Sequence, residues 1–171
     1  PQKAFSTHPQ SGGGGGGEPP APPGDTAANI VSAAAETGCR YMVMSRSDST
    51  LRGHYPLETE TLRRGLEQGG LRLDGEILCP FFLEGGRFTL GNTHYVHQDG
   101  MLVPAAQTEF AADPTFGYHH SDLPSYVEEK TGGRFPAAAA VCISLEELRA
   151  QDYGRLTEKL MGVRDFQKVC V

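Results

Sequence analysis

Apolar and polar positions follow two different rhythms along the chain from residue 25 onward. Short apolar runs without a helical period predict buried strands. These runs cover residues 41–45, 76–83, 137–145 and 166–171, and Pro80 interrupts the second. Between them the pattern predicts helices over residues 26–37, 56–70 and 145–161, and a further helix from a cap at Ser121 or Asp122 to about Lys130.

Two of these helices carry recognisable ends. Asp25 is a candidate N-cap of the first helix, and Gly38 follows its last residue. In the second, Pro56 occupies a first-turn position, acidic residues come early and arginines come later, and a Gly-Gly pair closes the segment. The end signals therefore support the helices that the periodicity predicts.

Residues 87–105 have a different texture, because aromatic and polar residues alternate there. Asp99-Gly100 separates the runs 94–98 and 101–105, and this dipeptide is the strongest short-range signal for a β-hairpin. We expect an antiparallel hairpin that projects from the sheet, followed by a loop over residues 108–123. Polar residues in or beside the hairpin form a lip over a substrate, a dimer contact or a solvated face. They are Arg87, Thr89, Thr93, Thr108 and Asp113.

The order of strands and helices predicts an α/β fold, with three α/β/α layers, a mostly parallel sheet and the projecting antiparallel hairpin. A chain of 171 residues suits one domain. Glycines and prolines predict a flexible N-terminal segment over residues 1–24, although residues 3–10 could be the tail of a strand. Residues 25–171 then form the domain. Nothing follows the last apolar strand to cover it, so we expect a piece of a longer protein.

Composition and charge disfavour several classes of function. The formal net charge is -6, the pI is about 5.5 and no block of Lys or Arg is present, which argues against nucleic-acid binding. No apolar stretch approaches ~20 residues and no signal peptide is recognisable, so we expect a soluble, cytoplasmic protein without a membrane partner. The cysteines lack CxxC spacing, and we expect buried, reduced thiols. They are Cys39, Cys79, Cys142 and Cys170.

The segment 46–54 follows a predicted parallel strand and precedes a helix. Small-molecule sites in open α/β sheets lie at such places, outside the carboxyl ends of the strands. The segment offers a carboxylate, two hydroxyls, an arginine suited to a carboxylate or phosphate, and a glycine that permits close backbone approach. A polyhydroxylated acid would satisfy these groups together. They are Asp48, Ser49, Thr50, Arg52 and Gly53.

An ordinary strand-to-helix turn is the alternative explanation of this segment. Ser and Asp before a helix are common caps, and Arg52 could pair with Glu58 or Glu60. The segment fits neither a Walker loop nor a GxGxxG fingerprint, and the chain lacks the GxSxG elbow of serine hydrolases. Taken on spacing alone, the binding loop and the capped turn both stay open.

Six histidines raise the question of a metal site, and we expect none. His119 and His120 lie near two aspartates and form the best cluster, but adjacent histidines on a loop usually point apart. His94 and His97 have an odd separation, which places them on opposite faces of a strand and disfavours a shared ligand role.

The residues SRSDSTLRGHYPLETE, at positions 45–60, resemble the signature segment of a known family. The family is the four-carbon acid sugar kinases, and the segment belongs to their N-terminal domain, long catalogued as a domain of unknown function or as a Hrp-dependent type III effector. The resemblance continues through ILCPFFLEGGRFTLGNTHYV and the closing strands, over roughly residues 26–171.

The resemblance implies ATP-dependent phosphorylation of a hydroxyl on a four-carbon sugar acid, such as a threonate or erythronate, or on a keto derivative. In that family the N-terminal domain holds the acid substrate and the C-terminal domain carries the nucleotide site. ATP and Mg²⁺ would thus serve the full-length enzyme, and no cofactor is expected for this chain. By position, the resemblance assigns Arg52 to the carboxylate and assigns His54 less securely, since relatives often have Asn there. The implied acid-binding loop comprises Asp48, Ser49, Thr50, Arg52, Gly53 and His54.

The chain also departs from that family. It lacks the Asp-Asp-x-Thr-Gly-Ala segment of the first strand and the nucleotide-binding half. Phosphoryl transfer depends on positioning and charge neutralisation by both halves with Mg²⁺, so we expect these 171 residues alone to have no kinase activity. The second hypothesis is a non-catalytic, truncated relative that binds a small molecule or a partner. A homo-oligomer is left open, and the catalytic base is expected elsewhere.

Overall fold

The computed structural model of the protein describes residues 2–7 and 23–171, which form two compact units. The first unit comprises Pro1–Asp48 and Gly53–Arg72, and the second comprises Ser49–Arg52 and Leu73–Val171. Four residues of the loop at 46–54 therefore belong to the second unit, while the residues on both sides of them belong to the first.

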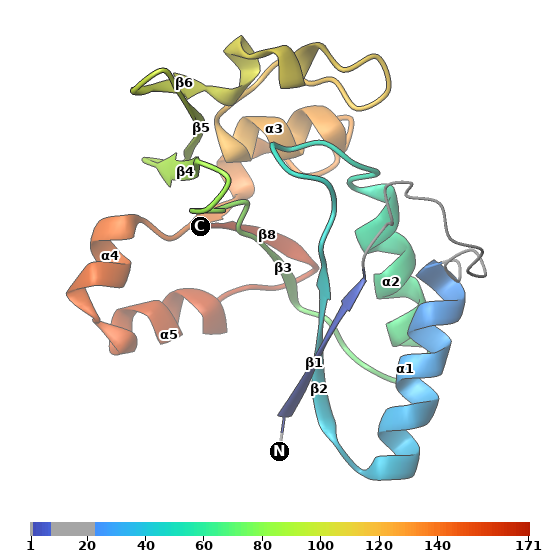
Figure 1. The fold of residues 1–171 in the computed structure, drawn as a ribbon. Coiled ribbons are helices and arrows are strands. Elements are labelled where there is room, and N and C mark those ends of the chain that lie inside the picture. Colours follow the sequence, from blue (N-terminus) through green and yellow to red (C-terminus); the bar gives the residue numbers. More distant parts are fainter. Residues whose placement is uncertain (1, 8–22) are drawn as a thin grey trace. The chain divides into compact units, whose positions relative to one another are not determined.

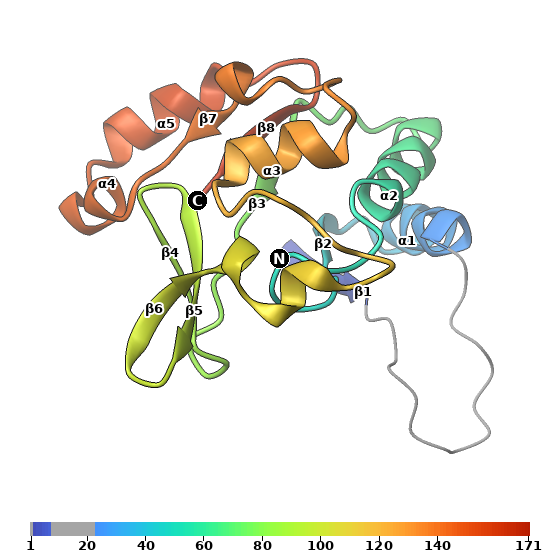
Figure 2. The ribbon, with the colours of Figure 1, turned by 90° about the horizontal axis from the view of Figure 1, so that it is seen from above.

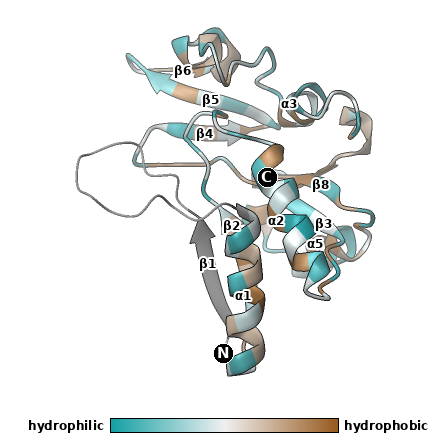
Figure 3. Ribbon diagram, turned by 90° about the vertical axis from the view of Figure 1, so that its right-hand side faces the viewer, coloured by the Kyte–Doolittle hydropathy of each residue, from teal (hydrophilic) through white to brown (hydrophobic). Residues whose placement is uncertain are grey.

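The first unit consists of a two-stranded parallel sheet and two helices. β1 (Gln2–Thr7) pairs with β2 (Arg40–Ser45), and α1 (Pro23–Thr37) packs on α2 (Leu57–Gln68), as Figure 1 shows. Hydrophobic and hydrophilic bands alternate along α1 (Figure 3), as expected for a helix with one buried face. The strand tail predicted near residue 3 is confirmed. Of the segment predicted to be flexible, residues 8–22 lie outside the described residues.

The second unit is built around a three-stranded parallel sheet. β8 (Gln167–Cys170) lies between β3 (Gly75–Leu78) and β7 (Val141–Cys142). On one face, α5 (Tyr153–Met161) covers a core of Ile143, Val163 and Val169. The other face carries α3 (Leu123–Lys130), so that helices lie on both sides of the sheet (Figure 2). β8, the last strand of the chain, is the central strand of this sheet.

A three-stranded antiparallel sheet completes the second unit. β4 (Arg87–Leu90), β5 (Thr93–Gln98) and β6 (Met101–Pro104) follow one another in that order. Asp99 and Gly100 have φ angles of 49° and 79°, the left-handed pair that a two-residue hairpin turn requires, so the predicted hairpin is confirmed. The structure adds β4, and it places two 3-10 helices, η1 (Ala105–Gln107) and η2 (Glu109–Ala112), at the start of the expected loop.

Two predicted strands are shorter than expected. Within residues 137–145 the structure has the 3-10 turn η3 (Ala137–Ala139) and only then β7, since alanine has little strand preference. Within residues 76–83, β3 ends at Leu78, two residues before Pro80, whose nitrogen cannot donate to a strand ladder.

The helix predicted over residues 145–161 is divided into α4 (Leu145–Ala150) and α5. Gln151 has a left-handed backbone, with φ at 54°, and ends α4. Asp152 then caps α5 by accepting a hydrogen bond from the backbone N–H of Arg155 at 3.0 Å. The capped helix at Asp122 is confirmed in the same way, because its carboxylate accepts from the backbone N–H of Ser125 at 3.0 Å.

The predicted α/β class is confirmed, with parallel strands in two separate sheets and an antiparallel hairpin. All four cysteines are free thiols, but only Cys170 is buried, and the prediction of burial is wrong for the exposed Cys79, which follows β3. Within residues 2–7 and 23–171, no helix is long and apolar enough to cross a membrane.

Candidate functional site

The loop Ser49–Arg52 has a strained backbone in the second unit. Thr50 and Leu51 have φ angles of 60° and 59°, in the left-handed region that residues with a Cβ rarely adopt. Each such residue costs about 1–3 kcal/mol, and the conformation persists only where the surrounding structure enforces it. Both side chains are buried, Thr50 at 2% and Leu51 at 6% exposure, so the loop is fixed by packing.

Two buried tyrosines hold the carbonyls of these strained residues. The hydroxyl of Tyr118 donates to the carbonyl oxygen of Thr50 at 2.9 Å, and that of Tyr126 donates to the carbonyl oxygen of Leu51 at 2.9 Å. The two rings contact edge to face, with centroids 5.7 Å apart. Burial raises the pKa of Tyr118 to about 12 and raises the pKa of Tyr126 as well, so both tyrosines are neutral hydrogen-bond donors at physiological pH.

Arg87 of β4 approaches the same loop through its side chain. Its Nε donates to Oγ1 of Thr50 at 2.7 Å, and its terminal nitrogen donates to the carbonyl oxygen of Gly85. Arg52 turns back on its own loop, because its Nε donates to the carbonyl oxygen of Ser49 at 3.2 Å. The guanidinium carbons of Arg52 and Arg87 lie 5.0 and 4.9 Å from the ring centroid of Phe110, so both arginines make a cation–π contact with the same ring.

The positive charges of Arg87 and Arg52 contribute to lower pKa values of two nearby residues, His94 and Asp113. The pKa of the buried His94 is lowered to about 4, first by burial and then by the positive charge of Arg87. The pKa of Asp113 is lowered by hydrogen bonds from two backbone N–H groups, and the charge of Arg52 acts in the same direction. The loop therefore combines two cationic side chains with two neutral, buried tyrosines, and the carboxylate of Asp113 is charged near Arg52. Two cations beside the loop favour an anionic ligand.

Three of the predicted site residues, Ser49, Thr50 and Arg52, are brought together in this unit. The other three belong to the first unit, where Asp48 and His54 are exposed. Gly53 has a φ of 116°, and a Cβ at that position would collide with the side chain of Ser47, so a glycine is required there.

The start of α2 bears on the capped-turn explanation of the loop. The N-cap of α2 is Pro56, and no side-chain hydrogen bond caps this helix end. A capping role for the hydroxyls and the carboxylate of the loop stays a prediction.

The polar hairpin residues do not form a simple solvated face. Arg87 and Thr89 are half-buried, and Thr108 is buried at 8% exposure. The sequence predicted Arg87 only as one of the polar residues in or beside the hairpin. It did not identify Phe110, Tyr118 and Tyr126 as residues that support the site. A single sequence carried no signal for them, since tyrosines and phenylalanines in a loop and a helix are ordinary core residues.

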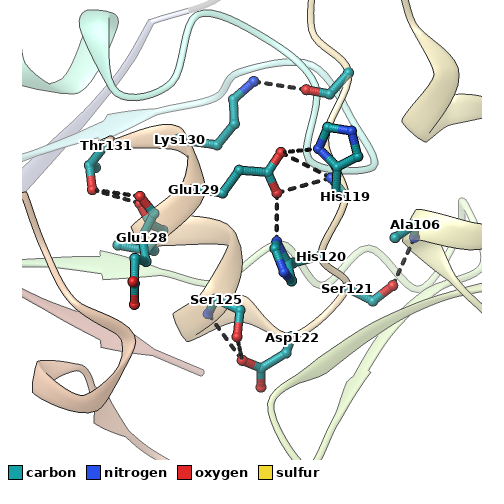
Figure 4. A network of polar contacts seen from close by, with 12 residues as sticks. Ala106, His119, His120, Ser121, Asp122, Ser125, Glu128, Glu129, Lys130 and Thr131 are labelled. Atoms are coloured by element: carbon teal, nitrogen blue, oxygen red, sulfur yellow. Dashed lines mark hydrogen bonds and ion pairs between the residues drawn. The ribbon is translucent and has the colours of Figure 1, made fainter. Parts of the chain in front are cut away.

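The adjacent histidines His119 and His120, in the loop before α3, do not point apart, contrary to expectation. Nδ1 of His119 and Nδ1 of His120 each lie 2.8 Å from a carboxylate oxygen of Glu129, which also accepts from the backbone N–H of His119 (Figure 4). Burial by itself would raise the pKa of Glu129. The hydrogen bonds from His119 and His120 lower it by more, so the pKa of Glu129 is lowered overall. The prediction for the hairpin histidines is confirmed, because His94 is buried and His97 is exposed.

No metal centre emerges from these groups. Across the described part of the chain, no three or more His, Cys, Asp or Glu side chains are placed so that they could hold a metal ion.

A family model described as "Sugar-binding N-terminal domain" matches residues 19–171 of the chain. No curated protein matches the chain in sequence. Among solved structures, a Haemophilus influenzae protein of the DUF1537 family aligns with a TM-score of 0.57 at 14% identity, over 85% of this chain and 33% of that one. A putative tRNA synthase from Salmonella typhimurium aligns with a TM-score of 0.56 at 16% identity, over 85% and 33%.

A third solved structure is a DUF1537 domain of Bordetella bronchiseptica, a domain-swapped dimer with bound citrate. It aligns with a TM-score of 0.50 at 21% identity, over 86% of this chain and 32% of that one. The chain thus spans about a third of the length of each of these proteins and shares their fold.

Proposed function

Because the chain belongs to the family of sugar-binding N-terminal domains, we propose that its loop Ser49–Arg52 binds the carboxylate of a four-carbon sugar acid. Threonate and erythronate are ligands of this class. The observation that carries the proposal is the strained pair Thr50–Leu51, fixed by two buried tyrosines beside two arginines. Strain that a fold maintains with buried hydrogen bonds is typical of ligand-binding loops.

The chemistry of the loop fits an acid with hydroxyl groups. A guanidinium binds a carboxylate through two parallel N–H donors, which a neutral sugar cannot match. The half-exposed hydroxyl of Ser49 and the backbone around it can hydrogen-bond the ligand hydroxyls. Citrate, named as bound in the Bordetella relative, is likewise a hydroxy acid.

In the proposed reaction the acid is the acceptor of a phosphoryl group from ATP, within a longer kinase. Arg52 fixes the carboxylate, and the rigid loop presents the ligand hydroxyls, so the contribution of this chain is positioning. ATP and Mg²⁺ would be held mainly by another part of that protein. These 171 residues alone are accordingly proposed to bind the acid without phosphorylating it.

Titration calorimetry with threonate, erythronate and the neutral polyol threitol tests the proposal. We expect one of the acids to bind, and we expect Arg52→Gln to weaken that binding roughly 10- to 100-fold, since a hydrogen bond to a charged group contributes about 1.5–3 kcal/mol. Arg149→Gln, which changes an exposed arginine of α4, is the matched control and should leave the affinity unchanged.

Three results would count against this proposal or a part of it. Failure of the folded protein to bind any four-carbon acid would remove the function altogether. Equal binding by wild type and Arg52→Gln would show that the acid binds elsewhere. If the full-length protein binds the acid but nucleotide has no effect, the non-catalytic binding protein is the better description.

A further inference from the structure

We infer that Arg87 is a second specificity-determining residue of the acid-binding loop, acting with Arg52 to select an anionic sugar over a neutral one. The inference rests on the proposed function of Ser49–Arg52 and deepens it. Arg87 lies 37 positions from Thr50 in the sequence, and it reaches the loop from β4.

Arg87 is held rigidly on its own side of the contact. Its backbone N–H donates to the carbonyl oxygen of Phe82 at 2.9 Å and its carbonyl accepts from Phe82 at 3.0 Å. One terminal nitrogen of the guanidinium donates to the carbonyl oxygen of Gly85. Because the backbone and the guanidinium of Arg87 are both restrained, its hydrogen bond to Thr50 restrains the side chain of Thr50 in turn.

The contact with Thr50 controls the strained part of the loop. The Nε–Oγ1 hydrogen bond of 2.7 Å fixes the side chain of a residue whose φ is 60° and whose carbonyl is held by Tyr118. With side chain and carbonyl both restrained, Thr50 cannot relax to a common backbone conformation without breaking two hydrogen bonds, of which the one from Tyr118 is buried and the one from Arg87 is partly buried. Arg87 therefore positions the loop through Thr50.

The shared ring of Phe110 adds an electrostatic effect. Two guanidinium groups lie within 5.0 Å of one ring centroid, so two positive charges are held close to each other and to the loop. In the described part of the chain, no Asp or Glu forms an ion pair with Arg87. An anionic group bound beside this pair gains attraction from both cations, whereas a hydroxyl gains little from either.

The two roles of Arg87 require arginine in particular. Its planar fork spans Thr50 and Gly85 while it lies over Phe110, and the single ammonium of lysine cannot make these contacts together. Arg87→Lys therefore keeps the charge and loses the alignment, and Arg87→Gln loses the charge.

The experiment compares affinities for threonate and threitol, which share a carbon skeleton, in wild type and both Arg87 variants. We expect Arg87→Gln to weaken threonate binding roughly tenfold or more and threitol binding less than about threefold, which lowers the acid preference. Arg87→Lys should retain more of the acid preference than Arg87→Gln and bind both ligands less tightly than wild type. Arg134→Gln is the control, because Arg134 lies over Phe135 at 5.7 Å in the same unit.

The outcomes separate this inference from the function on which it rests. If wild type prefers threonate and Arg87→Gln keeps that preference, the inference fails while the function stands. Equal weakening of both ligands, with a lower midpoint of thermal unfolding, would make Arg87 a merely structural residue and also overturn it. Wild type that binds no acid overturns the function and this inference together. Arg87→Lys keeps the test decisive if Arg87→Gln does not fold.

Discussion

His94 makes the stability of the protein depend on pH in a defined window. Its side chain is fully buried in the hairpin, and Nδ1 lies 3.2 Å from Oγ1 of Thr89 on the neighbouring strand. Burial, and after it the positive charge of Arg87, lowers the pKa of His94 from 6.5 to about 4 in the folded protein. The unfolded chain binds the proton at higher pH than the folded one, so acid favours unfolding.

The magnitude follows from this difference in pKa. A shift of one unit corresponds to 1.36 kcal/mol, so the folded state loses about 3 kcal/mol when the pH falls from above 6.5 to below 4. About 2 kcal/mol of this is lost between pH 7.5 and 5. The contribution is fully present above the unfolded pKa of 6.5, and it disappears as the pH falls toward the folded pKa.

Urea unfolding at several pH values between 7.5 and 5 measures the effect. We expect His94→Gln to be less stable than wild type at pH 7.5 but to lose about 2 kcal/mol less on acidification, because it has no proton to bind there. His97→Gln, on the exposed face of the same strand, is the matched control and should follow the wild-type curve. If His94→Gln and wild type lose stability in parallel, His94 does not titrate as argued.

Two further substitutions test the buried polar contacts. Lys168→Met removes the partner of the Glu76 carboxylate, whose side chain is 13% exposed on the adjacent strand. It should lower the free energy of unfolding in urea, by at most about 3 kcal/mol because Glu76 is only partly buried, and the double variant with Glu76→Leu should recover most of this loss. Tyr126→Phe leaves the carbonyl of Leu51 without its donor and should lower the free energy of unfolding by about 1–3 kcal/mol. Tyr153→Phe, at an exposed position, is the control and should change the free energy of unfolding little. Equal stability of both tyrosine variants would contradict the proposed support of the loop.

The parts of the fold that were predictable have local causes. The Asp99-Gly100 turn fixes its hairpin because both residues accept a positive φ, and the signal lies within two positions. The apolar stripe of α2 buries Leu62 and Leu66, one turn apart, which periodicity alone reveals. Asp122 caps α3 through a contact three residues away. In each case the decisive interaction spans a few residues.

Errors arose where a local signal had two meanings. Residues 145–161 carry a continuous helical pattern, yet the chain turns at Gln151, because Asp152 provides a cap that starts a new helix. Residues 137–145 are apolar, but their alanines lack the branched side chains that favour strands, and only two residues pair with β8. Composition identified these segments as buried without determining their geometry.

The candidate site depends on contacts that no local pattern contains. The residue types of the loop were readable, and their position after a strand indicated a ligand site, but its conformation is set by residues 37, 68 and 75 positions away. Arg87, Tyr118 and Tyr126 hold a backbone that Thr50 and Leu51 would not adopt unaided. If the loop binds an acid as proposed, its affinity is a property of the folded second unit. A peptide of residues 46–54 would not reproduce it, because the peptide would keep the contact of Arg52 with Ser49 but lose the ring of Phe110 and the three side chains that hold the loop backbone.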